Sequence, residues 1–146
     1  MATKDTIIQS SQSDRLSYMT GDLFSLDNHF DGIAAFVPCG LTSFRADCER
    51  FIEMDTPGIV MIADLNKGNK IYSIVDVDRM VTNSLDALSQ HGAKRIGMNG
   101  IRTDLGSGPS EKAVAQSCLQ WLNAHPDTDI HITLVDKRGG FINNCI

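Results

Sequence analysis

The chain has 146 residues, of which 42% are hydrophobic and 21% are charged. This length and composition are typical of one globular domain, so we expect a single domain over residues 1–146. The formal net charge is −5 and the basic residues are scattered, which argues against a nucleic-acid partner, because such a surface needs clustered Lys and Arg. No apolar run reaches the roughly 18 residues of a membrane span, so no membrane contact is expected.

The four cysteines are Cys39, Cys48, Cys118 and Cys145, and they form no Cys-x-x-Cys pair. No histidine stands at metal-ligand spacing from them, so we predict neither a metal site nor a cofactor. Cys48 and Cys118 fall on the apolar faces of expected helices, which indicates core packing. Because the first residues are polar and show no signal-peptide pattern, we expect reduced thiols and a cytoplasmic location.

The first half of the chain alternates short apolar segments with polar turns. The β-branched residues 6–8 indicate an edge strand, and 16–19 indicate a second short strand. The continuous small-apolar run 32–37 is typical of a strand buried on both faces of a parallel sheet. Apolar side chains recur at helical spacing over 41–52, and 59–63 is a further buried strand.

The second half alternates strands and helices more regularly. We predict a strand over 71–77, a helix through Val81, Leu85 and Leu88 that ends at His91-Gly92, and a strand over 95–101. A helix marked by the apolar residues between 114 and 122 and a strand over 130–135 follow. This alternation predicts an α/β fold with crossover units, a mostly parallel sheet and helices on both faces.

The segment with the most chemical content runs from Thr103 to Pro109, between an expected strand and an expected helix. Gly106 and Gly108 allow a close backbone approach to a ligand and positive φ, and Pro109 suits a first helical turn. The free N–H groups and the positive helix end would face this loop, which makes an anion site. The loop lacks the Gly-Lys-Ser/Thr of a P-loop, and a plain connection is the alternative interpretation.

The order of these short motifs resembles that of the macro domains, from about residue 16 to the C-terminus. The matching segments are Met19-Thr20-Gly21-Asp22-Leu23, Asp31-Gly32-Ile33-Ala34, Thr56-Pro57-Gly58, Arg95-Ile96-Gly97-Met98 and Thr103 to Pro109. The resemblance implies a three-layer α/β/α sandwich with a mixed, mostly parallel central sheet. It also implies a small-molecule ligand such as ADP-ribose or a related nucleotide diphosphate, free or attached to an ADP-ribosylated protein, in a cleft at the carboxyl ends of the strands.

The resemblance also implies a role for individual residues. Asp22 would accept a hydrogen bond from the adenine amino group, which a carboxylate suits because it only accepts, and the Leu23 backbone would hold the ring edge. Phe141 would pack on the adenine, and the loop would bind phosphate. The implied ligand-binding residues are Asp22, Leu23, Thr103, Asp104, Leu105, Gly106, Ser107, Gly108 and Phe141. The alternatives are a local backbone cap for Asp22 and a core or lid position for Phe141.

The chain departs from the family pattern at Ala35-Phe36-Val37-Pro38, where the family has Asn-Ala-Ala-Asn. Ala35 has no side chain that could hydrogen-bond the distal ribose, and residues 41–48 replace the glycine-rich first loop of the family. Hydrolysis of ADP-ribosyl groups needs the distal ribose and a water positioned together, so these changes argue against it. Three hypotheses remain, namely an ADP-ribose-binding module, an ADP-ribosyl hydrolase with an altered site, and a macro-fold scaffold for protein contacts.

Overall fold

Five strands come first among the described elements, and helices and strands alternate from Ile74 onward, as the apolar pattern of the second half predicts. The computed structural model describes residues 7–23, 30–37, 49–52, 58–63, 74–90, 92–100 and 108–145. Within these ranges the strands are β1 (Ile7–Gln9), β2 (Leu16–Thr20), β3 (Gly32–Val37), β4 (Glu49–Ile52), β5 (Gly58–Ala63), β6 (Arg95–Met98) and β7 (His131–Asp136). The helices are α1 (Ile74–Gln90), α2 (Pro109–Ala124) and α3 (Gly140–Cys145).

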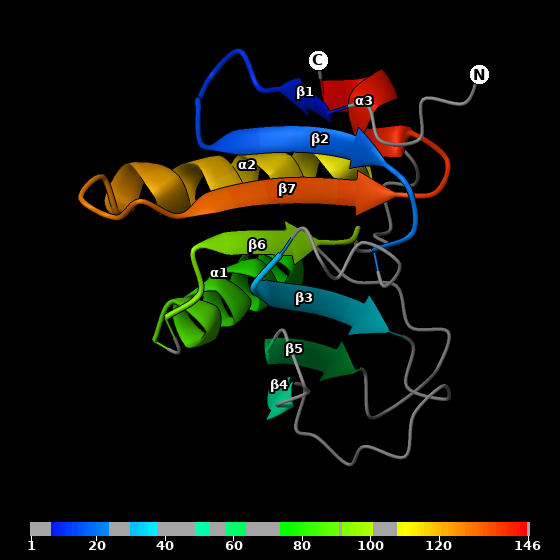
Figure 1. Ribbon diagram of the computed structural model, residues 1–146. Helices are drawn as coiled ribbons and strands as arrows, with labels where there is room; N and C mark the ends of the chain where they lie inside the picture. The colour runs from blue at the N-terminus through cyan, green and yellow to red at the C-terminus, as the bar shows by residue number, and fades with distance from the viewer. Residues whose placement is uncertain are drawn as a thin grey trace.

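The strands form one mixed sheet in the order β1-β2-β7-β6-β3-β5-β4 (Figure 1). The five central strands pair in parallel, whereas β1 and β4 are antiparallel edge strands. The predicted α/β fold with a mixed, mostly parallel sheet is therefore confirmed. Because parallel strands end at one edge, on the right in Figure 1, the segments that follow β2, β6 and β7 meet there.

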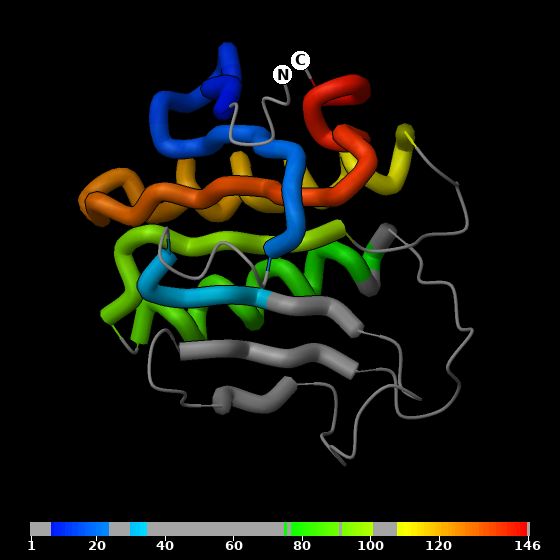
Figure 2. The backbone as a smooth tube through the Cα atoms, turned by 45° about the vertical axis from the view of Figure 1, so that its right-hand side comes forward, coloured from blue at the N-terminus to red at the C-terminus, as the bar shows by residue number. Residues whose placement is uncertain are grey.

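The two faces of the sheet carry separate apolar clusters, because successive strand residues point to opposite sides. Ile96 and Met98 point to the face covered by α1 and α2, where they join a cluster with Leu85 and Leu122. Figures 1 and 2 show these two helices side by side behind the sheet, and α3 packs against α2. The opposite face carries a smaller cluster of Met19, Leu23, Phe30, Ile33 and Val135. The three described helices thus contribute to the larger cluster.

Two sequence predictions are wrong in part. A strand is predicted over 71–77, but residues 74–77 form the start of α1. Val77, Met80 and Val81 recur at helical spacing and are all buried in the core, which favours the helix. This packing outweighs the strand propensity of the β-branched residues. Residues 49–52, predicted as the end of a helix, form β4 and pair with β5. The rest of that predicted helix, including Cys48, lies outside the described residues.

Other local predictions are confirmed. Helix α1 ends before Gly92, whose φ of 84° suits glycine, and Pro109 occupies the first turn of α2. Cys118 and Trp121 pack in the core, at 0% and 4% exposure. None of the described helices has both the length and the apolar character that crossing a bilayer would require.

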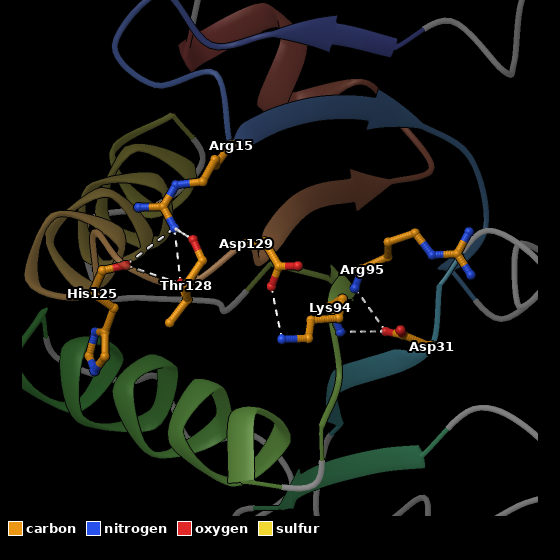
Figure 3. Close-up of polar contacts among 7 residues, drawn as sticks. All are labelled: Arg15, Asp31, Lys94, Arg95, His125, Thr128 and Asp129. Carbon is orange, nitrogen blue, oxygen red and sulfur yellow. Dashed lines mark hydrogen bonds and ion pairs between the residues drawn. The ribbon is translucent and has the colours of Figure 1, made fainter.

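Polar contacts fix the amino-terminal edge of the sheet, opposite the edge where the parallel strands end (Figure 3). Arg15, directly before β2, donates from Nη1 to the Thr128 carbonyl at 2.9 Å and from Nη2 to the Leu122 carbonyl at 2.8 Å. A third carbonyl, that of His125, accepts from Nη1 at 3.3 Å. A cation bonded to the last carbonyls of a helix is favourable for charge and geometry alike, so Arg15 ties the end of α2 to β2.

Asp31 makes the corresponding tie between β3 and β6. Its Oδ1 accepts from the backbone N–H groups of Lys94 and Arg95 at 2.9 and 2.8 Å (Figure 3). The Asp31 N–H in turn donates to the Arg95 carbonyl at 2.9 Å. These bonds set the register in which β3 and β6 run toward the opposite edge.

Replacing Arg15 with Met removes the guanidinium and keeps most of the apolar stem. We expect the free energy of unfolding to fall by about 1.5–3 kcal/mol, because one charged group loses its bonds to three carbonyls. Urea unfolding followed by circular dichroism measures the change. Arg95→Met is the matched control, since the Arg95 guanidinium bonds to none of the described residues, and it should cost less than about 0.5 kcal/mol. Equal losses in the two variants would contradict the role of Arg15.

Candidate functional site

A cavity of about 430 Å³ opens at the carboxyl-terminal edge of the sheet. Its walls come from the segments that follow three adjacent strands, β2, β7 and β6. The lining residues are Gly21, Asp22, Leu23, Asn99, Gly100, Val135, Asp136, Lys137 and Arg138. A ligand site in an open α/β sheet is expected at this position, because the crevice forms beyond the carboxyl ends of the strands.

The apolar part of the wall depends on a glycine in β6. Gly97 points away from α1 and α2, and a Cβ built on it would lie 2.6 Å from two ring carbons of Phe30 and 2.9 Å from Cδ1 of Leu23. Both side chains therefore sit directly on the β6 backbone, where any larger residue would displace them. Leu23 lines the cavity and is only 5% exposed. Its contact with the Gly97 backbone of β6 therefore fixes the position of its side chain.

Asp22 and Leu23, two of the predicted ligand-binding residues, are brought together in this wall. The Asp22 side chain is 44% exposed, and its Oδ2 lies 3.9 Å from Nζ of Lys137 across the end of β7. A long ion pair between exposed groups contributes little to stability. Because 44% of the Asp22 side chain is exposed and Asp22 lines the cavity, a ligand can reach it.

The turn between β7 and α3 is held firmly. Both carboxylate oxygens of Asp136 accept from the Gly140 N–H, at 2.9 and 2.8 Å, and Gly139 has a φ of 73°. A Cβ on Gly140 would lie 2.6 Å from Asp136 Oδ2 and 2.8 Å from Glu111 Oε2. The dihedral angle favours glycine at 139, and a Cβ at 140 would have to displace the Asp136 and Glu111 carboxylates.

Of the predicted ligand-binding residues in the loop, the structure describes Gly108; Thr103, Asp104, Leu105, Gly106 and Ser107 lie outside the described residues. It caps α2 with a φ of 94°, as a loop glycine that must adopt positive φ does. Its N–H donates to Glu111 Oε1 at 2.6 Å, and its carbonyl accepts from Lys112 at 3.0 Å. The N-terminus of α2 therefore lies at the edge of the sheet that carries the cavity (Figure 1).

Phe141 lies behind the cavity wall. It is 0% exposed and belongs to the larger core cluster, and its Cζ is 3.5 Å from where a Cβ on Gly100 would stand. The Gly100 backbone thus separates the ring from the cavity. This is the core position that the sequence left open for Phe141, and the adenine contact remains a prediction.

Sequence reasoning missed the residues that follow β6 and β7. The sequence predicts Asn99 and Gly100 as part of a longer strand, whereas β6 ends at Met98, and no motif marks Asp136, Lys137 or Arg138. The usable signal was topological, because every residue directly after a parallel strand is a candidate for the crevice.

The described thiols are not activated. Burial raises the pKa of the Cys118 thiol, and burial with the nearby Glu111 carboxylate raises that of Cys145 to about 11. Both thiols are therefore protonated at neutral pH, whereas the nucleophilic form of cysteine is the thiolate. Among the described residues, no three His, Cys, Asp or Glu side chains gather in a way that could hold a metal ion.

Comparison with known proteins identifies the fold family of the structure. No family model matches the sequence, and no curated protein matches it. Solved structures do match. The macro domain of ganglioside-induced differentiation-associated protein 2 has a TM-score of 0.69 at 9% identity, over 97% of this chain and 88% of that one.

A Trypanosoma brucei macrodomain in complex with ADP-ribose has a TM-score of 0.71 at 8% identity, over 94% of this chain and 72% of that one. An Oceanobacillus iheyensis macrodomain gives 0.63 at 9% identity, over 95% of both chains. This chain has the macro-domain fold. At 8–9% sequence identity the likeness lies in the arrangement of the elements.

The Gly97 contact gives a prediction about this macro-domain wall. Gly97→Ala should lower the free energy of unfolding by about 1–3 kcal/mol, because the added methyl overlaps the Phe30 ring. Phe30→Leu removes the overlapping ring atoms, so the double variant should lose clearly less than the sum of the two single losses. Urea unfolding of all four proteins in the cycle measures this coupling. Additive losses would show that Phe30 does not limit the space at Gly97.

Proposed function

We propose that this macro-fold protein binds ADP-ribose or a related nucleotide diphosphate in the cavity at the carboxyl ends of β2, β7 and β6. The observation that carries the proposal is the position of Asp22 and Leu23, which the family resemblance implies as the adenine contacts and which line this cavity side by side. Trypanosoma brucei macrodomains of the same fold have been solved with ADP-ribose and with ADP. The fold and the cavity support the same ligand class.

The adenine end of the ligand has suitable partners. The half-exposed Asp22 carboxylate accepts from the exocyclic amine, which has only donors to offer. Leu23 and Val135 line the cavity but are only 5% and 0% exposed, so they form its packed base rather than a surface that covers the ring. The Leu23 contact is therefore assigned to its backbone, as the family resemblance implies, beside the directional Asp22 acceptor.

The phosphates are assigned to the loop that ends at Gly108. Thr103 to Ser107 carry the glycine and serine backbone that suits close approach to an anion, and Pro109 begins α2 at the loop's end. In this proposal the positive end of α2 and the loop N–H groups hold the diphosphate, and the ligand is either free or attached to a protein. The chain works as one cytoplasmic domain, and no hydrolytic step is included, because Ala35 and Pro38 stand where the family pattern has asparagine.

Asp22→Ala tests the proposal by calorimetric titration with ADP-ribose, using AMP and NAD for comparison. We expect one saturable site in the wild-type protein and affinity on the order of tenfold weaker in the variant, because a charged acceptor for the adenine amine is lost. Asp78→Ala is the matched control, since Asp78 is an exposed acidic residue on α1. Thermal unfolding of both variants separates lost binding from lost folding.

The proposal fails if the wild-type protein gives no saturable heat with any of the three ligands. It also fails in its assignment of the adenine site if Asp22→Ala and Asp78→Ala bind ADP-ribose equally well. In the first case, a scaffold function for the fold becomes the hypothesis to test.

A further inference from the structure

The cavity wall contains one cation that the described residues leave unpaired. Four charged residues line the cavity, namely Asp22, Asp136, Lys137 and Arg138. Both oxygens of Asp136 accept from the Gly140 N–H, and Asp22 lies 3.9 Å from Lys137. Arg138 is exposed and makes no hydrogen bond or ion pair with the part of the chain that the structure describes.

This arginine is carried by a rigid turn rather than by a free loop. The Asp136 carboxylate accepts a hydrogen bond from the Gly140 N–H, and the Asn143 N–H donates to the Gly139 carbonyl at 2.9 Å. Gly139 also approaches β2 closely, because a Cβ on it would lie 3.3 Å from Thr20 Oγ1. The backbone of Arg138 is therefore held before a ligand arrives, which reduces the entropy lost on binding.

We propose that Arg138 is a phosphate-binding residue of this cavity and selects ligands that carry a phosphate over the bare nucleoside. The guanidinium offers a planar fork of N–H donors that matches two phosphate oxygens, and it makes no ion pair with either cavity carboxylate, Asp22 or Asp136. This inference rests on the proposed nucleotide function and adds a second anion contact, from the β7–α3 turn, to the glycine loop before α2.

The test compares Arg138→Gln with the wild-type protein against adenosine, AMP, ADP and ADP-ribose. Binding of ADP-ribose is titrated directly, and adenosine is measured by its displacement of ADP-ribose. We expect the variant to bind ADP and ADP-ribose on the order of tenfold more weakly, and adenosine to change by less than about twofold. A loss shared by AMP assigns the contact to the phosphate attached to adenosine; a loss confined to ADP and ADP-ribose assigns it to the outer phosphate.

Two further variants separate recognition of phosphate from general charge. Arg138→Lys keeps the charge and loses the fork, so its ADP-ribose affinity should fall between those of the wild type and Arg138→Gln. Arg95→Gln is the matched control at the opposite edge of the sheet and should bind as the wild type does. Raising the salt concentration should weaken wild-type binding more than binding by Arg138→Gln.

The outcomes distinguish this inference from the proposed function. If the wild type binds ADP-ribose and Asp22→Ala weakens it while Arg138→Gln does not, the nucleotide function stands and the role of Arg138 is wrong. The role is also wrong if adenosine and ADP-ribose weaken equally, because the effect then does not depend on phosphate. If the wild type binds none of the four ligands, both proposals fall together.

Discussion

Asp136 joins the segments on which the cavity depends. Its backbone carbonyl accepts from the Gly21 N–H at 2.8 Å, which ties the end of β2 to the end of β7. Its carboxylate accepts from the Gly140 N–H and so closes the turn into α3. One residue at the end of a central strand thus positions Asp22 on one side and Arg138 on the other. A carboxylate used in this way is structural, and its charge is compensated by the turn rather than offered to a ligand.

Polar contacts at the amino-terminal edge of the sheet fix the strands whose other ends form the cavity. Arg15 binds the carbonyls at the end of α2, and Asp31 binds two N–H groups at the start of β6 (Figure 3). Because the strands run parallel from these ties, a fixed register at the amino-terminal edge becomes a fixed set of strand ends at the other. The stability of the sheet and the geometry of the cavity therefore depend on polar contacts made at opposite ends of the same strands.

The sequence predicts the central strands well because their apolar runs are short, continuous and bounded by turn residues, as at Gly32–Val37. It fails at Ile74, where β-branched residues favour a strand locally and packing of Val77 against the core makes a helix. Asp22 and Leu23 could be named from the sequence because a motif marks them, and both line the cavity. Lys137 and Arg138 carry no motif, and only the strand order reveals that their turn borders the same cavity as β2.

The charge distribution is consistent with the proposed binding of a small anion by an acidic chain. The net charge of −5 is spread over the whole molecule, so it opposes a long polyanion that would cover much of the surface. At 0.15 M ionic strength, charges more than about 8 Å apart are largely screened, so a single phosphate responds mainly to the groups beside it. Beside the cavity these groups are an ion pair, a carboxylate bound to backbone and the guanidinium of Arg138. In the proposed function the Arg138 guanidinium supplies the local attraction for a phosphate, while the overall charge opposes binding of a nucleic acid.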